Sequence, residues 1–131
     1  MAATEPLWSF GYASIAPAPL SRLQLHAILE SSLAANAQAQ VTGLLLHCDG
    51  SFLQVLEGPR AGVHAIAERI RRSPLHCDMR VLFDEPIAQR EFGHWAMACK
   101  EIAPGDLQGL LRDAPGGSNR RLLAEYWKAW S

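Results

Sequence analysis

Chemistry in this chain is best sought at four side chains that are polar or soft although their segments read as buried: Tyr12, Asn36, Gln54 and Met97. Gln54 is the sharpest case, because it alternates with Phe52 and Leu56 and so shares their face of a strand. A buried amide without a hydrogen-bond partner costs about 1–3 kcal/mol, so we expect a neighbouring group to bind it. The residues alone leave two interpretations open, a structural glutamine and a glutamine in a functional site.

Two adjacent pairs, His47–Cys48 and His76–Cys77, resemble metal ligands. Neighbours on an extended chain point to opposite faces, and the sequence contains no ligand quartet with zinc spacing, so we expect no metal site. A hydrolytic triad can be written from three separate residues, Ser14, Asp84 and His94. No nucleophile-elbow glycine pattern accompanies that serine, and the sequence therefore predicts no catalytic triad.

The first strand and helix must position two of the four candidates. Alternation over Leu7–Ser14 predicts a strand with Tyr12 on its aromatic face. Ser21 and Gln24 have the spacing of a capping box, and the helix that they begin extends to about Ala35. Three residues four apart form a stripe on this helix that turns polar toward its end: Ile28, Ser32 and Asn36. A buried stripe that ends in polar side chains predicts a binding partner.

The remaining core elements alternate in type. Asp49–Gly50 is a strong hairpin signal between two apolar runs. A second helix follows Gly58–Pro59 and ends at Ser73–Pro74. Glu57 precedes this helix, and we expect its carboxylate to cap the turn into the helix rather than to act as an acid in a functional site. The predicted strands are Val41–His47, Ser51–Glu57, Met79–Phe83 and Phe92–Lys100.

The order βαββαββ predicts an α+β, ferredoxin-like fold with an antiparallel or mixed sheet and both long helices on one face. Asp106 can cap a short helix, and a final helix carries five large apolar side chains: Leu122, Leu123, Tyr126, Trp127 and Trp130. Such an apolar helix must pack on something. We therefore expect residues 1–103 to form the core and residues 104–131 to form a helical extension covering the other face of the sheet.

Composition excludes several classes of protein. The 131 residues carry 12 basic and 13 acidic side chains, so no general positive field favours nucleic acid or anionic lipid. The longest apolar stretches are far too short to cross a bilayer, and the first six residues lack the pattern of a secretory signal. Three widely spaced cysteines are typical of reduced thiols. We expect a cytoplasmic protein of one domain that binds neither nucleic acid nor membrane.

Several motifs together resemble the BLUF family of flavin-dependent blue-light sensors. They are Tyr12–Ser14, Asn36 followed by Val41–Gly43, the run Gly50–Gly58, and Phe92 with Trp95–Met97. The resemblance extends over about Leu7–Ile102, which is nearly the whole core. It implies the same ferredoxin-like fold that the order of elements predicts.

The resemblance also implies roles. Tyr12 resembles the photoactive tyrosine that gives an electron and a proton to the excited flavin and then recovers them. Gln54 resembles the glutamine between this tyrosine and the flavin, whose amide changes its hydrogen bonds, and Trp95 and Met97 match the signalling pair of the last strand. The cofactor is expected to be FAD, with FMN and riboflavin as alternatives. The implied flavin contacts are Tyr12, Ile28, Ser32, Asn36, Gln54 and His76.

The chain departs from the family pattern on the side expected to meet the cofactor phosphates. Leu75 stands before His76, where members often carry an arginine, and Ala35 precedes Asn36, where some relatives carry a polar side chain. Arg71 and Arg72 could compensate, but cations at a helix C-terminus are more simply solvated. Phosphate anchoring therefore differs here from the family pattern.

The leading hypothesis is a photoreceptor, without enzymatic activity, that forms homo-oligomers and signals to an effector on another chain, because we expect no effector segment after residue 103. The first alternative is a flavin-free interaction module with the same fold. The second is a small hydrolase of phosphate esters or acyl phosphates. The hydrolase is disfavoured because the first loop, Ile15–Leu20, contains neither a basic residue nor a glycine that could cradle a phosphate.

Overall fold

A computed structural model describes residues 6–16, 21–73, 77–91 and 98–111. Its five strands are β1 (Leu7–Ile15), β2 (Thr42–Cys48), β3 (Ser51–Pro59), β4 (Cys77–Pro86) and β5 (Ala98–Glu101). Its three helices are α1 (Arg22–Gln38), α2 (Arg60–Arg71) and α3 (Pro104–Leu111). In the described ranges, no helix is both long and apolar enough to span a membrane.

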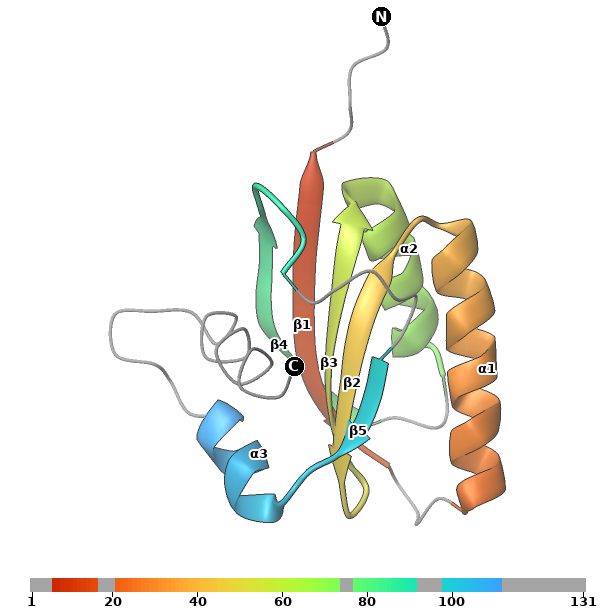
Figure 1. The fold of residues 1–131 in the computed structure, drawn as a ribbon, viewed down its shortest axis with the longest axis vertical. Helices are drawn as coiled ribbons and strands as arrows, with labels where there is room; N and C mark the ends of the chain where they lie inside the picture. Colours follow the sequence, from red (N-terminus) through yellow and green to blue (C-terminus); the bar gives the residue numbers. More distant parts are fainter. Residues whose placement is uncertain (1–5, 17–20, 74–76, 92–97, 112–131) are drawn as a thin grey trace, which may run out of the picture.

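The strands form one mixed sheet in the order β4-β1-β3-β2-β5 (Figure 1). The pairs β1–β3, β1–β4 and β2–β3 are antiparallel, and β2–β5 is parallel. Asp49 and Gly50 connect β2 to β3 with φ of 47° and 82°. Positive φ at both central residues is the geometry of the hairpin turn that an Asp-Gly pair favours, so this sequence signal is confirmed. In the strand order of the sheet, β1 and β3 are neighbours and neither is an edge strand.

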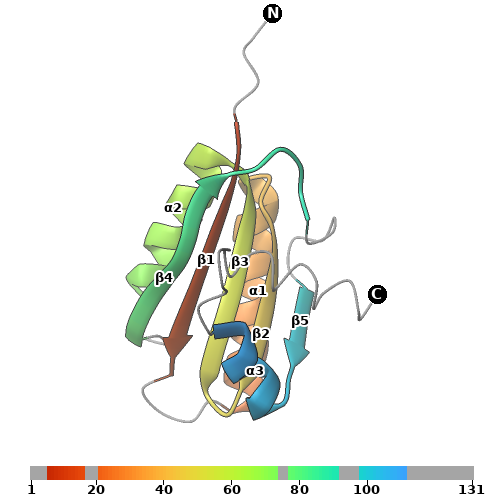
Figure 2. The same cartoon turned by 90° about the vertical axis from the view of Figure 1, so that its left-hand side faces the viewer.

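The helices cover the two faces of the sheet separately. Figure 2 shows α1 and α2 behind the sheet and α3 in front of it. One hydrophobic cluster includes Tyr12, Leu45 and Val63, with Leu25 and Leu29 of α1 packed against it. A second cluster on the other face joins Leu107 and Leu110 of α3 to β2, β3 and β4. The prediction of both long helices on one face is thus confirmed for the described residues.

Helix α1 is well capped but packs lightly on the sheet. Ser21 and Gln24 form the predicted capping box, with bonds of 2.9 and 3.1 Å. The helix ends at Gln38, about three residues later than predicted, and Asn36 is the one residue of α1 that is buried. A helix that buries so little of its own surface leaves room between itself and the rest of the core.

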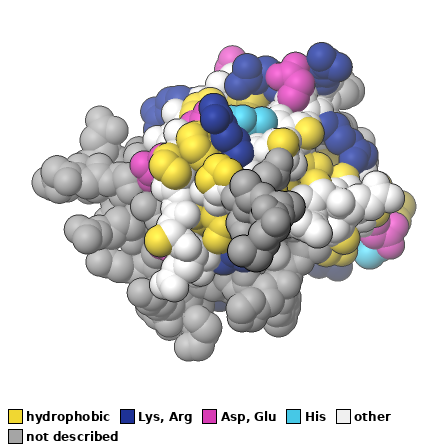
Figure 3. All heavy atoms as spheres, turned by 90° about the horizontal axis from the view of Figure 1, so that it is seen from above, with side chains coloured by type: hydrophobic (Ala, Val, Ile, Leu, Met, Phe, Trp, Pro, Cys, Tyr) yellow, Lys and Arg dark blue, Asp and Glu magenta, His cyan; other side chains and the backbone are white. Residues whose placement is uncertain are grey.

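Helix α2 is fixed to the edge of the sheet by Trp8. The Trp8 indole N–H donates to Asp84 Oδ1 on β4, and His64 Nε2 lies 2.9 Å from the same oxygen. The Arg60 guanidinium lies 4.6 Å from the Trp8 ring centroid, within the range of a cation–π contact. Figure 3 looks onto this end of the molecule, where basic, acidic and histidine side chains lie beside hydrophobic ones. These contacts hold α2 against β1 and β4.

The structure corrects several boundaries. β4 extends over Cys77–Pro86 rather than Met79–Phe83, because a long stretch of it pairs with β1. Of the predicted strand Phe92–Lys100, the described part is β5, which extends to Glu101. Residues 92–97 and the predicted final helix with Trp127 and Trp130 lie outside the described residues.

Candidate functional site

Tyr12 and Gln54 face each other across the centre of the sheet. They are direct cross-strand partners in the antiparallel register of β1 and β3. Side chains opposite each other in such a pair lie on the same face and in contact distance. The Tyr12 hydroxyl donates a hydrogen bond to Gln54 Oε1. The register therefore brings together two of the four candidate residues.

The Tyr12–Gln54 pair is shielded from water. Tyr12 is 0% exposed and Gln54 is 4% exposed. Burial raises the pKa of the Tyr12 phenol well above its ordinary value, because the phenolate would lose its hydration. The tyrosine consequently keeps its proton over the whole physiological pH range. A neutral phenol bound to an amide oxygen has one proton that can move along one defined hydrogen bond.

A cavity of about 310 Å³ lies between α1 and α2. Three predicted cofactor residues of α1 line it: Ile28, Ser32 and Asn36. Ile66 and Ile70 of α2 form part of the opposite wall. Tyr12 and Gln54 do not themselves line the cavity. Ile66, however, belongs to the same hydrophobic cluster as Tyr12, so the cavity adjoins the cluster that contains the tyrosine.

Arg69 is a lining residue that sequence reasoning missed. Its guanidinium Nη2 donates a 2.8 Å hydrogen bond to Ser31 Oγ, which joins α2 to α1 at the cavity. The signal was present in the sequence, because Arg69 lies between Ile66 and Ile70 on an apolar helical stripe. A cation within such a stripe indicates an acceptor nearby. Arg71 and Arg72 are exposed and do not line the cavity.

The cavity fits a flavin ring in size and in chemistry. Ligand sites of this kind have volumes of roughly 300–1,000 Å³, with mainly apolar walls and a few polar groups. Here isoleucines from both helices supply apolar walls, while Ser32, Asn36 and Arg69 supply hydrogen-bonding groups. An isoalloxazine needs this combination, because its flat faces are apolar and one edge carries carbonyl and N–H groups. The light packing of α1 leaves the space that such a ring would occupy.

Glu57 does not cap the second helix, so that prediction was wrong. Helix α2 has no side-chain cap, and Glu57 is instead fully buried at the end of β3. Both of its carboxylate oxygens accept a hydrogen bond from the backbone N–H of Glu91, at 3.0 Å each. Its partner lies 34 positions away in the chain, a separation that no local sequence signal reveals.

Three predicted site residues, His76, Trp95 and Met97, lie outside the described residues. Of the three cysteines, Cys48 is a buried free thiol and Cys99 an exposed one. The side chain of Cys77 is not described. The structure thus brings together Tyr12 with Gln54, and separately Ile28, Ser32 and Asn36 at the cavity.

Comparison with known proteins identifies a family. The model of the BLUF family, described as sensors of blue light using FAD, matches residues 7–98. The chain is also 39% identical over 92 residues to the photoactivated adenylate cyclase subunit beta of Euglena gracilis. This match covers 70% of the chain but 11% of the relative, so the chain spans about a tenth of that protein's length.

Solved structures of similar fold agree. The dark-state structure of the BLUF protein BlrB has a TM-score of 0.71 and 27% identity, covering 82% of this chain and 80% of that one. BlrP1 of Klebsiella pneumoniae, solved with FMN and cyclic diGMP, has a TM-score of 0.71 and 26% identity. That match covers 93% of this chain and 34% of BlrP1. The described sheet and helices therefore have the arrangement seen in solved BLUF proteins.

Proposed function

This chain belongs to the BLUF family of flavin-based blue-light sensors, and we propose that it binds a flavin between α1 and α2 and responds to blue light through Tyr12 and Gln54. The observation that carries the proposal is the hydrogen bond from the buried Tyr12 hydroxyl to Gln54 Oε1, next to a cavity of suitable size. The family match alone would not assign these roles to particular residues.

The residues that would hold the flavin line the cavity. Ile28 of α1 and Ile66 and Ile70 of α2 supply apolar contacts to the faces of the ring. Asn36, Ser32 and Arg69 supply donors and acceptors for its polar edge. Arg69 is the one basic residue among the described residues that line the cavity. We therefore propose that Arg69 donates a hydrogen bond to an acceptor atom of the cofactor, in addition to its bond to Ser31. FAD is the expected cofactor, with FMN and riboflavin as alternatives.

A bound flavin supplies absorption of blue light and, when excited, a strong one-electron acceptor. Tyr12 is an oxidisable side chain in the hydrophobic cluster that adjoins the cavity, and its hydroxyl proton lies on a hydrogen bond to Gln54 Oε1. Loss of an electron makes the phenol strongly acidic, so this proton leaves toward the amide and returns when Tyr12 recovers its electron. Gln54 carries an acceptor at Oε1 and donors at Nε2, and rotation of the amide exchanges them. The pair can thus change its hydrogen bonding without net chemistry.

The output is proposed to be contact with a separate protein. A change at Gln54 alters which neighbouring group its amide hydrogen-bonds. Such a change can favour one of two conformations and so shift the equilibrium between them. Trp95 and Met97 remain the proposed signalling residues that pass this bias to an effector. We also propose that the chain forms homo-oligomers in the cytoplasm. The Euglena relative is a subunit of a photoactivated adenylate cyclase, so the effector in that protein is a cyclase.

The test is a set of absorption spectra of the purified chain, supplied with FAD if it is colourless, taken in darkness, after blue light and during dark recovery. We expect a flavin band that shifts slightly to the red and returns. The matched control is Tyr12→Phe, which should bind flavin but lack the normal photocycle. An unchanged shift in this variant would reject the role of Tyr12. A wild-type chain that binds no flavin would instead leave an interaction module with the same fold.

A further inference from the structure

The connection that follows β4 contains an arginine that the proposed photochemistry does not use. Arg90 Nη1 donates to Thr42 Oγ1 and to the Glu57 carbonyl oxygen, each at 2.8 Å. Its Nη2 donates to the Gln40 carbonyl oxygen, also at 2.8 Å. The three acceptors belong to the start of β2, the end of β3 and the exit from α1. One guanidinium therefore joins three segments; we call this set of bonds the Arg90 clamp.

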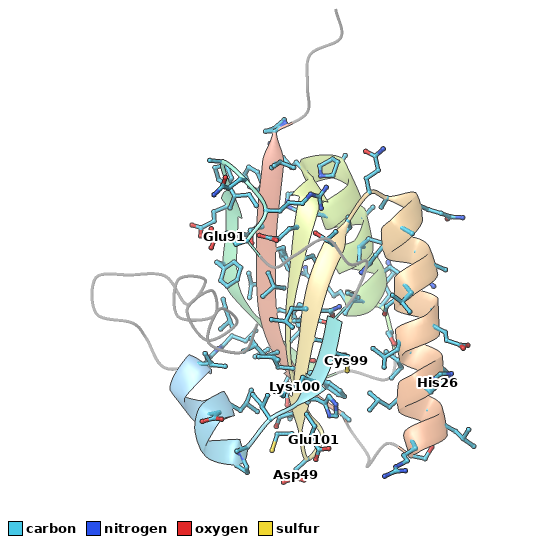
Figure 4. The ribbon with its side chains drawn as sticks, in the orientation of Figure 1. His26, Asp49, Glu91, Cys99, Lys100 and Glu101 are labelled. Carbon is cyan, nitrogen blue, oxygen red and sulfur yellow. The ribbon has the colours of Figure 1, made fainter. Side chains whose placement is uncertain are left out.

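Two contacts anchor the connection that carries Arg90. The backbone N–H of Glu91 donates to both carboxylate oxygens of the fully buried Glu57. At the other end, the N–H of Ile87 donates to the Leu7 carbonyl at 3.0 Å. Figure 4 labels Glu91, which lies toward the same end of the sheet at which α1 ends. Arg90 is thus presented from a segment attached to the sheet on both sides.

The exit from α1 needs such an attachment. Gln40 has φ of 59°, a left-handed conformation that is unfavourable for a residue with a side chain. The N–H of the next residue, Val41, donates to the Asn36 carbonyl at 2.8 Å. Asn36 is therefore hydrogen-bonded to the residue that directly follows Gln40, whose carbonyl Arg90 binds. Gly58 lies against this segment too closely for a side chain, since a Cβ there would be 2.8 Å from the Gln40 oxygen. The end of α1 is therefore held by close packing and by Arg90.

We propose that Arg90 is a positioning residue for the flavin site, because its clamp fixes the carboxyl end of α1 and thereby the place of Asn36 at the cavity. Asn36 is the one fully buried residue of α1, and Leu25 and Leu29 nearer the start of the helix are only partly buried, so contacts at the carboxyl end matter most for its position. A guanidinium with three acceptors in fixed directions is suited to this task, whereas an ammonium cannot match them equally well. The inference rests on the proposed function, since it assigns Arg90 to the same cavity.

The experiment compares Arg90→Gln with Arg90→Lys and with the control Arg80→Gln, which removes an exposed arginine from β4. Flavin affinity is measured by titration with FAD, and the absorption band of the bound fraction is recorded. Arg90→Gln should weaken binding about tenfold and move the band, because loss of charge-assisted bonds displaces Asn36. Arg90→Lys should recover part of the affinity, and Arg80→Gln should match the wild type.

A double-mutant cycle with Asn36→Ala tests whether Arg90 acts through Asn36. If it does, Arg90→Gln has little further effect on affinity once Asn36 is absent. Equal tenfold losses in both backgrounds would overturn the proposal, as would wild-type affinity in Arg90→Gln. If Arg90→Gln does not fold, Thr42→Val removes one acceptor at nearly constant volume and should weaken FAD binding about threefold, in an Asn36-dependent manner. Unchanged affinity in folded Thr42→Val would then count against the clamp.

Failure of the proposed function gives a different result. A wild-type chain that binds no flavin refutes the sensor, but hydrogen exchange at the Val41 amide still tests the clamp in the absence of cofactor. That amide is bonded to Asn36, and we expect Arg90→Gln to accelerate its exchange about tenfold relative to Arg80→Gln. Equal exchange in the two variants would overturn the fixing of the α1 end.

Discussion

At the scale of single residues, the proposed function depends on the hydrogen bond between the Tyr12 hydroxyl and the Gln54 amide. A phenol can lose an electron together with its proton, and an amide can offer either an acceptor or a donor. Burial makes the interaction sensitive, because a polar group that loses its partner there cannot turn to water. In the proposed mechanism, oxidation of Tyr12 would therefore change the hydrogen bonds of a buried pair and so affect the structure around it.

Gln54→Leu should abolish the light-induced red shift while leaving flavin bound, since no amide remains to change its hydrogen bonds. It should also lower the free energy of unfolding by about 1–3 kcal/mol, because the buried Tyr12 hydroxyl loses its Gln54 acceptor. Light-minus-dark spectra and urea unfolding measure the two effects. An exposed glutamine, Gln89→Leu, is the control. A normal shift in Gln54→Leu would show that the amide is not the switching group.

Burial of Tyr12 also predicts how stability depends on alkaline pH. Its pKa is raised in the folded state, so above pH ~10 the unfolded chain gives up a proton that the folded chain keeps. The raised pKa of Tyr12 therefore has no effect on stability well below pH ~10. As the pH rises further, the free energy of unfolding falls, by about 1.4 kcal/mol between roughly pH 9 and 11. Urea unfolding at both pH values measures it. Tyr12→Phe should lack this part of the loss, and equal losses in both proteins would contradict the assignment.

At the scale of elements, β1 is shaped by the absence of a side chain at Gly11, next to Tyr12. The Phe83 ring of β4 lies over Gly11, where an added Cβ would overlap the ring. The β1–β4 register shifts between Gly11 and Tyr12. Gly11 therefore admits the ring that fills the core on the side of α3, while Tyr12 points to the opposite face.

Gly11→Ala should lower the free energy of unfolding by about 1–3 kcal/mol, because the added methyl group overpacks the buried Phe83 ring. Phe83→Leu creates room for the methyl group. The double variant should therefore be less destabilised than the sum of the two single variants, as measured by thermal or urea unfolding. Additive losses would show that the ring is free to move away from Gly11.

At the scale of the whole molecule, the two faces of the sheet have different tasks. The face with α1 and α2 carries the cavity and the Tyr12–Gln54 pair, and α3 packs on the other through Leu107 and Leu110. The division into a core of residues 1–103 and a helical extension of residues 104–131 remains a proposal. It assigns the extension to covering an apolar face that water would otherwise contact.

Two truncations test this division. A chain that ends at Leu111 keeps α3, and a chain that ends at Ala103 loses it and exposes the apolar residues beneath, among them Leu44, Val55 and Phe83. We expect the shorter chain to unfold at lower temperature and to self-associate more than the longer one, because exposed apolar patches drive association. Calorimetry and sedimentation measure these properties. Equal behaviour of the two chains would mean that α3 does not protect the sheet.

Features that depend on neighbouring residues in the chain could be predicted from the amino-acid sequence. Alternation gave the central strands, the Ser21–Gln24 spacing gave the start of α1, and Asp49–Gly50 gave the hairpin. The same local rules singled out Tyr12, Asn36 and Gln54 as polar groups in apolar segments, and all three are buried.

Contacts between residues far apart in the chain became visible only in the folded protein. The register of β1 against β3 sets Tyr12 opposite Gln54, and the packing of α2 beside α1 brings Arg69 to Ser31. Glu57 was misassigned because its partner, the N–H of Glu91, approaches only after β4 has returned along the sheet. Local propensity is set by a few neighbouring residues, whereas these contacts depend on how separate elements pack, so periodicity and spacing contain no signal for them.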